Sequence, residues 1–266
     1  SKFIHLHTHS HYSLLDGLSK VEQMVKIAKD SKMPAMAITD HGNMYGAIEF
    51  YKECKKAGIK PIIGCEVYVA ERRMEDKEPG VDNKRYHLIL LAKNLKGYKN
   101  LMRIVTEANL KGYYYKPRVD MELLREFHEG IIALSGCMGG KLSRAILSGN
   151  EDKAEELIKE HVEVFGKENY FIEIQAHPHI ERDQELREKL VTLAKKHDLP
   201  YVATQDSHYP CKDDHEAHHT LLQVNTGADG KDSSKFEFSD DDFSLIDEKT
   251  ALKYFSDFPE AVTNTS

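Results

Sequence analysis

The chain has 266 residues, of which 40% are apolar and 30% charged, and 44 acidic against 37 basic side chains give it a net charge of −7. These values predict a soluble globular protein of one α/β domain or two small ones, and they argue against a body that grips nucleic acid mainly by charge. Because no apolar run approaches the roughly 18 residues of a membrane span, no signal peptide precedes the first predicted strand, and the four cysteines form no CxxC pair, we expect a cytoplasmic protein with no membrane partner.

Short apolar runs alternate with amphipathic helical patterns along most of the chain. The predicted strands are Phe3–Leu6, Ala35–Thr39, Pro61–Val69, Tyr86–Leu91, Ile131–Leu134, Tyr170–Ile174 and Tyr201–Thr204. The predicted helices include Val21–Asp30, Ile48–Ala57, Tyr98–Leu110, Asp152–Phe165 and Glu185–His197, with an extra helix pair between Ser143 and Phe165. Repeated βα units predict a parallel sheet, either a closed or nearly closed barrel or a doubly wound sheet.

Three segments break this alternation. Glu71–Arg85 is polar and predicts an excursion or hairpin, and Lys111–Arg118 predicts a loop. After about Lys212 the alternation stops, and Gly227–Asp242 is polar and turn-like. We therefore expect one α/β unit, the barrel or the doubly wound sheet, over residues 1–212, and a short C-terminal extension or the start of another domain over residues 213–266.

The first predicted strand runs into HLHTHSH, in which histidines occupy alternate positions from His5 to His11. Residues two apart in an extended strand point to the same face, so these imidazoles would lie together. A remnant of a purification tag would be contiguous and would not run into an apolar, structured segment. The pattern favours a metal site whose other ligands come from elsewhere in the chain.

Polar residues follow or begin six of the seven predicted strands, at the rim where α/β barrels place their active sites. They are His7 and His9, Asp16, His41, Glu66, His87, Cys137, and finally Asp206 and His208. Each motif alone is weak, because a single TDH or DxH is more often a capped turn. Nine such groups exceed the four ligands of one zinc ion and suit a cluster of two or three metals.

The motifs HLHTHSHYSLLDG, AITDHG, GCE, RYHLILLAKN, LSGC and ATQDSHY, in this order, resemble the PHP (polymerase and histidinol phosphatase) domain. More narrowly, SLLDG, YYKPR and FPEAVTNT resemble the amino-terminal domain of bacterial DNA polymerase III alpha subunits. The resemblance implies a distorted, TIM-like (β/α)7 barrel that holds up to three metals. It assigns all nine residues above as ligands, whereas His5 matches a position that is not a usual ligand and His11 is expected to be exposed.

Several other residues have a functional and a structural interpretation. His177 is expected near the site, whereas Lys116 and Arg118 of YYKPR would either meet a substrate phosphate or belong to a packed loop, the interpretation we favour. The tract HEAHHT at 215–220 has metal-like spacing but lies past the last strand, so it is interpreted as a surface helix.

The leading functional prediction is a metal-dependent phosphoesterase, specifically a 3′→5′ exonuclease that proofreads for an attached polymerase. Two close metals activate a water and clamp both oxygens of a phosphodiester, and zinc, manganese and iron all suit the donors. Asp16, His9, Asp206 and His208 are the predicted catalytic residues. The expected partners are a weakly bound DNA 3′ end, the rest of the polymerase subunit and a separate proofreading exonuclease. The alternatives are a non-catalytic scaffold that docks that exonuclease, and a small-metabolite phosphatase of the histidinol-phosphatase type.

Overall fold

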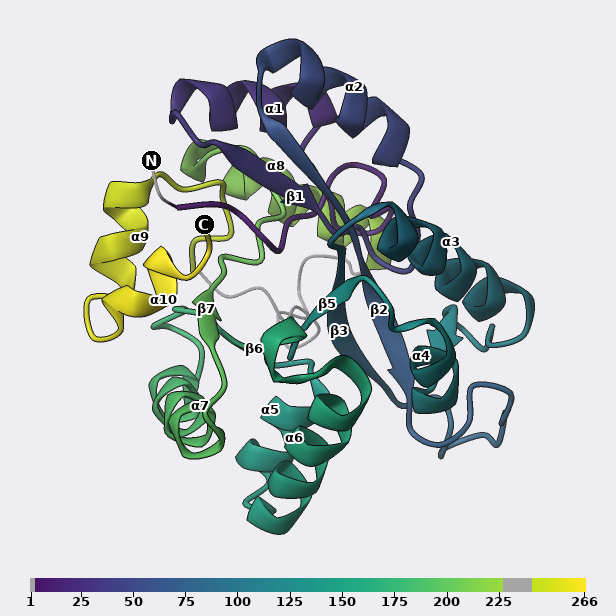
Figure 1. Ribbon diagram of the computed structural model, residues 1–266. Coiled ribbons are helices and arrows are strands. Elements are labelled where there is room, and N and C mark those ends of the chain that lie inside the picture. The colour runs from purple at the N-terminus through teal and green to yellow at the C-terminus, as the bar shows by residue number, and fades with distance from the viewer. Residues whose placement is uncertain (1–2, 227–240) are drawn as a thin grey trace.

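The computed structural model describes residues 3–226 and 241–266. Its centre is a curled seven-stranded sheet in the order β1-β2-β3-β5-β6-β7, with β4 paired to β2, and helices surround it (Figure 1). The strands are β1 Ala35–Ile38, β2 Lys60–Ala70, β3 Arg85–Ala92, β4 Arg118–Val119, β5 Ile131–Leu134, β6 Tyr170–Ile174 and β7 Tyr201–Ala203. The helices are α1 Val21–Asp30, α2 Ala47–Ala57, α3 Leu95–Leu110, α4 Met121–Phe127, α5 Lys141–Leu147, α6 Glu151–Phe165, α7 Asp183–His197, α8 His215–Thr226, α9 Glu248–Tyr254 and α10 Pro259–Thr263. The expected α/β class with a curled seven-stranded sheet is confirmed.

Local signals explain why most element bounds agree with the sequence. The helices α1, α2, α6 and α7 start and end within two residues of their predicted bounds, and α5 with α6 forms the expected pair. Asn94 caps α3 by accepting a hydrogen bond from the Gly97 amide at 3.0 Å. Gly58 ends α2 with a φ of 78°, a conformation that glycine adopts without the steric cost of a Cβ.

The sheet is mixed, so the prediction of a parallel sheet was wrong. β2 pairs antiparallel with β3, and β3 pairs antiparallel with β5, whereas β1–β2, β5–β6 and β6–β7 are parallel. The connection from β2 to β3 contains turns but no helix, and a chain without a crossover returns in the opposite direction. As a consequence, the amino end of β3 lies at the same rim as the carboxyl ends of the parallel strands.

The prediction of a first strand over Phe3–Leu6 was also wrong, because the first strand of the sheet is Ala35–Ile38. The amino-terminal segment is extended, but it forms isolated bridges rather than a ladder, and the seventh strand is the short β4 inside the predicted loop. The Ala37 amide donates to the His5 carbonyl at 2.8 Å on one side, and the His9 amide donates to the Ser207 carbonyl at 2.8 Å on the other. The segment therefore lies between β1 and the end of β7 and connects the two edges of the curled sheet.

The hydrophobic core has two parts. The larger part lies between the sheet and the helices, whereas a smaller cluster lines the inside of the curl. A cavity of about 730 Å³ opens from this smaller cluster at the amino ends of the parallel strands, and its lining includes Pro61, Ile62, Ile132, Phe171 and Val202. The interior of the sheet is thus apolar and open at the end opposite the predicted metal rim.

Residues 241–266 pack against the sheet rather than apart from it. Leu245, Ile246, Phe255 and Val262 belong to the larger core, and α10 lies against β7 (Figure 1). The domain boundary at residue 212 stays a prediction, and most of the turn-like segment Gly227–Asp242 lies outside the described residues. Among the helices of the described ranges, none has the length and hydropathy needed to cross a membrane.

Candidate metal centre

All nine predicted ligands lie in one cluster at the rim. His41 follows β1, Glu66 lies within β2, His87 is near the start of β3, and Cys137 follows β5. The remaining donors come from the amino-terminal segment and from the loop after β7. Asp206 in that loop has a φ of 53°, a left-handed conformation that Asp tolerates better than most residues do. This turn directs Asp206 and His208 to the same centre.

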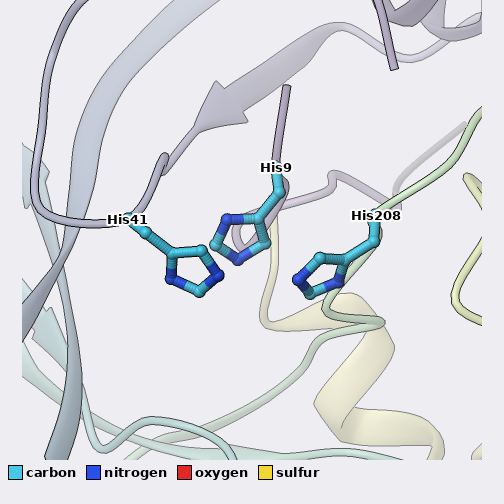
Figure 2. A group of neighbouring side chains, drawn as sticks. All are labelled: His9, His41 and His208. Carbon is cyan, nitrogen blue, oxygen red and sulfur yellow. The ribbon is translucent and has the colours of Figure 1, made fainter. Parts of the chain in front are cut away.

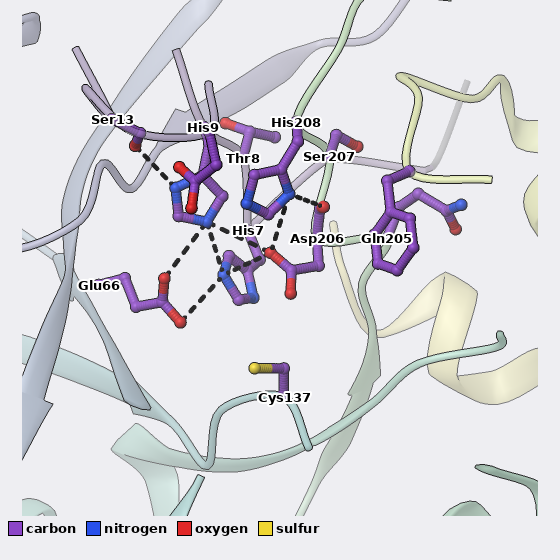
Figure 3. Close-up of polar contacts among 12 residues, drawn as sticks. His7, Thr8, His9, Ser13, Glu66, Cys137, Gln205, Asp206, Ser207 and His208 are labelled. Atoms are coloured by element: carbon purple, nitrogen blue, oxygen red, sulfur yellow. Dashed lines mark hydrogen bonds and ion pairs between the residues drawn. The ribbon is translucent and has the colours of Figure 1, made fainter. Parts of the chain in front are cut away.

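A first group of donors is buried and combines two imidazoles with two carboxylates (Figure 3). The Nε2 atoms of His7 and His9 lie 3.1 Å apart. The Asp206 Oδ1 lies 3.0 Å from His7 Nε2 and 3.2 Å from His9 Nε2. Glu66 reaches the same two nitrogens at 3.6 and 3.3 Å. The donor atoms of four side chains therefore converge on one small volume.

A second group consists of three neighbouring imidazoles, those of His9, His41 and His208 (Figure 2). The His9 ring stacks between those of His41 and His208, with centroid distances of 4.1 and 4.3 Å. Each ring offers a nitrogen within 4.8 Å of those of the other two. The Asp16 carboxylate lies 3.2 Å from His41 Nε2 and adds a negative charge at this side of the cluster.

A third group joins Glu66, His87 and Cys137, whose donor atoms also lie within 4.8 Å of one another. The Glu66 Oε1 lies 2.7 Å from His87 Nδ1, and the Cys137 Sγ lies 3.4 Å from the same nitrogen. Glu66 thus belongs to two groups, as a carboxylate that bridges two ions would. Its position in the middle of the cluster matches that of a bridging ligand.

The outward nitrogens of three imidazoles are held by other groups. His7 Nδ1 hydrogen-bonds to Glu173 at 2.7 Å, and His9 Nδ1 to the Ser13 hydroxyl at 2.9 Å. His208 Nδ1 donates to the Asp206 carbonyl at 2.7 Å. Such contacts fix the tautomer that places a proton on Nδ1 and a lone pair on Nε2, which is the usual arrangement in metal sites.

Sequence reasoning missed Glu173 and Ser13. Glu173 is buried and lies on β6, the predicted strand to which no metal ligand was assigned. A glutamate within the apolar run YFIEI was the available signal, because a charged residue in a buried strand needs a partner. Ser13 donates to the Asp40 carboxylate at 2.9 Å, so His9 is oriented through two further residues.

These residues fit a group of divalent metal ions. Both oxygens of Glu66, Asp206 Oδ1 and His41 Nδ1 are buried and lack a hydrogen bond of normal geometry among the described residues. Imidazole nitrogens nevertheless lie within 4 Å of each of these carboxylate oxygens, and a Glu66 oxygen lies 2.5 Å from His41 Nδ1. Short distances without shared hydrogens are expected where lone pairs point at a common cation. The donor set of imidazole, carboxylate and thiol suits zinc, manganese or iron.

The electrostatics of the cluster favour added positive charge. Burial would raise the pKa of Glu66, yet His87, His41 and His7 hold it well below its usual value. Burial would lower the pKa of His7, but Asp206, Glu173 and Glu66 raise it well above its usual value. In His208 burial and the neighbouring His9 prevail and lower the pKa to about 4. The carboxylates thus draw protons onto some imidazoles, and metal ions would supply the same positive charge.

The other histidines of the opening motif lie outside the cluster. His5 is buried and its Nε2 contacts the Ile246 carbonyl at 3.0 Å, whereas His11 is exposed. His177 is buried and stacks on Phe243 with a centroid distance of 4.2 Å. Burial lowers the pKa of His177 to about 4 against the opposing charge of Asp206. It therefore lies near the cluster, and its contact with a substrate stays a prediction.

Arg118 belongs to a packed loop, the interpretation that the sequence favoured, whereas the interpretation of HEAHHT as a surface helix needs correction at His218. Arg118 is fully buried and its guanidinium donates to the carbonyls of Gly112, Asp82, Met74 and Asp76, so it cannot also bind a substrate phosphate. His218 of HEAHHT does not lie on the surface. It is buried, and its Nε2 hydrogen-bonds to the Asp16 carbonyl at 2.8 Å. Through this hydrogen bond, the helix that carries the tract supports the backbone of the candidate ligand Asp16.

A curled α/β sheet whose rim gathers His, Asp, Glu and Cys side chains is typical of metal-dependent α/β barrels. The family model of the PHP domain matches residues 5–177, and the chain belongs to this family. The chain is 44% identical over 264 residues to the DNA polymerase III subunit alpha of Treponema pallidum and 43% identical over 264 residues to that of Thermus aquaticus. These alignments cover 99% and 98% of the chain but only 22% and 21% of those proteins. The chain thus spans about a fifth of the length of the curated relatives it matches.

Solved structures of low sequence identity share the fold. A protein from Bifidobacterium adolescentis, described as a metal-dependent phosphoesterase, aligns with a TM-score of 0.54 at 13% identity and covers 95% of both chains. An amidohydrolase from Chromobacterium violaceum aligns with a TM-score of 0.52 at 17% identity, over 79% of this chain and 89% of that one. These likenesses support the architecture alone.

Proposed function

We propose that the chain is the PHP domain of a DNA polymerase III alpha subunit and that it hydrolyses phosphodiesters as a 3′→5′ exonuclease. One observation carries the hydrolytic part: nine donors converge at the rim, and the three imidazoles His7, His9 and His208 present their Nε2 atoms with the opposite nitrogen already held. The likeness to long polymerase chains carries the choice of DNA as substrate.

The roles of the residues follow from their positions. Divalent ions held by the nine donors would supply an activated water and stabilise the charge that develops on the phosphate. Asp206 and Glu66 would provide the negative charge between the imidazoles, whereas Asp16 is partly exposed and faces the open side of the cluster. Glu173 and Ser13 keep protons on the outward nitrogens of His7 and His9. Asp16, His9, Asp206 and His208 are the catalytic residues of this proposal.

The negative net charge predicts weak DNA binding. On single strands, log K falls by about 0.7 per phosphate neutralised for each tenfold rise in salt concentration. A cluster that holds one or two phosphates should therefore give a high KM and a shallow salt dependence, with frayed or single-stranded ends preferred. A salt dependence that implied six or more contacts would show a DNA-binding face that the proposal lacks.

The test combines metal content with hydrolysis. The purified domain, loaded with zinc or manganese and desalted, should retain two to three ions per chain by elemental analysis and should shorten a 5′-labelled single strand from its 3′ end. Retention of metal without hydrolysis would favour the scaffold that docks a separate exonuclease. Hydrolysis of histidinol phosphate but not of DNA would favour the metabolite phosphatase. Fewer than one ion per chain would refute the metal centre.

A further inference from the structure

Two cations lie beside the metal centre without a carboxylate partner. Lys116 Nζ lies 5.6 Å and Arg85 Cζ 5.8 Å from the centre of the Tyr68 ring. Within residues 3–226 and 241–266, no ion pair involves either side chain, whereas Lys111 on the same loop pairs with Glu107 at 2.8 Å. In a chain with an excess of acidic groups, two unpaired cations on one ring are a conspicuous local concentration of positive charge.

Tyr68 connects these cations to the candidate ligands. Its ring lies 6.0 Å from that of His41 in a stacked arrangement and 5.5 Å from that of His87 edge-on. The Tyr68 side chain is buried, so the cations cover one part of its ring and the histidines lie against another. Burial and the charge of Arg85 lower the pKa of Lys116, whereas the charge of Asp16 opposes this shift.

The backbone around Lys116 is braced in an unusual conformation. Tyr115 has a φ of 60°, which a bulky residue adopts only at a steric cost. The Tyr114 amide donates to the Lys116 carbonyl at 3.0 Å, and buried Arg118 closes the loop through the Gly112 carbonyl at 3.0 Å. These two hydrogen bonds hold the strained turn at Tyr115 and Lys116 in one orientation.

The same loop packs directly on the turn that carries His41. A Cβ on Gly42 would lie 2.7 Å from Pro117 Cγ, so only glycine allows the two segments to come this close. Gly42 also has a φ of 64°, which favours glycine for a second reason. Lys116 is therefore held beside the candidate ligands by the close packing of its neighbour Pro117 on Gly42.

We infer that Lys116 and Arg85 form a phosphate subsite that binds the phosphodiester next to the scissile one, with Tyr68 as the wall between this subsite and the metals. The inference rests on the proposed function and extends it to a strand rather than a single nucleotide. Lysine and arginine side chains are the usual partners of backbone phosphates. They act here as positioning residues, because they hold the strand and do not touch the bond that breaks.

The experiment compares two substrates of the metal-loaded domain. One is a single-stranded oligonucleotide, and the other is the p-nitrophenyl ester of thymidine 5′-phosphate, which has a scissile phosphodiester but no second phosphate. Lys116→Ala and Arg85→Ala should each raise KM for the oligonucleotide about tenfold, the loss of one charge-assisted contact, with little change in kcat. The KM for the ester should stay unchanged, and the salt slope for the oligonucleotide should fall by about 0.7.

Lys111→Ala is the matched control, because it removes the same charge from the same loop but from a lysine that is already paired with Glu107. Lys116→Arg should retain most of the affinity. An active wild-type domain whose KM for the oligonucleotide is unaltered by Lys116→Ala would overturn the subsite and leave the proposed function standing.

A wild-type domain that hydrolyses neither substrate would refute the proposed function instead. The subsite would then be decided by equilibrium binding of a fluorescent oligonucleotide. Weaker binding by Lys116→Ala than by Lys111→Ala would support it, and equal binding would overturn it.

Discussion

The two ends of the curled sheet have opposite chemistry. At the carboxyl rim, buried imidazoles and carboxylates contact one another and are oriented by Glu173 and Ser13. At the amino end, a cavity of about 730 Å³ has an apolar lining and no such set of polar partners within the described residues. The strands thus keep a dense polar centre at one end and loosely filled apolar space at the other. Function and stability should therefore respond to different substitutions, as in other α/β barrels.

The largest effect should come from Asp206→Asn, which leaves the shape of the side chain but removes its charge. Because Asp206 Oδ1 lies within 3.2 Å of two imidazole nitrogens, we expect phosphoesterase activity to fall by more than the roughly 100-fold typical of an outer-shell partner. His9→Ala should have a similar effect. The fold should persist, as circular dichroism would show.

Asp198→Asn is the matched control for this substitution. Asp198 has the same left-handed φ of 53° but is exposed on α7's C-terminal cap, so the change should leave activity unaltered. Full activity in Asp206→Asn and His9→Ala, with metal content intact, would reveal a contaminating nuclease.

Removal of metals should destabilise the whole domain. A ligand at 100 times its dissociation constant stabilises the folded state by about 2.7 kcal/mol, which corresponds to a Tm about 5–10 °C higher for a chain of this size. Calorimetry of the metal-loaded and chelator-treated domain measures the difference, and added zinc or manganese should restore it. An unchanged Tm after verified loss of metal would mean that the centre binds too weakly to support the fold.

Glu173→Gln tests the residue that sequence reasoning missed. The amide can still hydrogen-bond to His7, but it no longer raises the basicity of the ring, so metal affinity or activity should fall about 10- to 100-fold. Metal titration and steady-state kinetics would measure both quantities. Glu188→Gln on the exposed face of α7 is the control and should change neither. If Glu173→Gln and Glu188→Gln bound metal with equal affinity, Glu173 would have no role in the site.

Metal affinity should fall as the pH decreases. In the metal-free protein the surrounding carboxylates raise the pKa of His7 and His41 well above the usual value, so protons occupy these rings at neutral pH and must leave when metal binds. Each displaced proton weakens apparent affinity about tenfold per unit decrease in pH, because the rings are mostly protonated below their pKa. Titrations at pH 7 and 8 measure this change, and identical affinities would contradict the assigned protonation.

The smallest expected difference is that between substitutions in the two parts of the core. Leu90 and Leu91 are neighbours on β3, but Leu90 packs in the larger core and Leu91 lines the cavity. Leu90→Ala should cost about 2–5 kcal/mol, whereas Leu91→Ala should cost less because open space already adjoins it. Urea denaturation compares them, and metal content should stay normal in both. A greater cost for Leu91→Ala would show that the cavity wall is as tightly packed as the core.

Local patterns in the sequence were sufficient for most elements and for the candidate ligands. The bounds of β5, β6 and α1 agree with prediction because apolar periodicity and capping residues act within a few residues. The candidates could be selected because polar residues at strand ends are conspicuous beside apolar runs. Their role as ligands stays a prediction, although all nine lie together.

Only the tertiary structure decided how these pieces meet. The reversal at β3 follows from the helix-free connection after β2, and the pairing of β3 with the more distant β5 completes the sheet. His87 thereby reaches the rim from the start of a strand instead of its end. The support of His7 by Glu173 and of Asp16 by His218 joins residues 166 and 202 positions apart, which no local pattern encodes. For Arg118 the sequence left both a substrate-phosphate contact and a packed loop open. The structure shows that its guanidinium instead donates to four backbone carbonyls inside the protein. Short-range propensities therefore determined the elements and their donors, and long-range packing determined their directions, partners and roles.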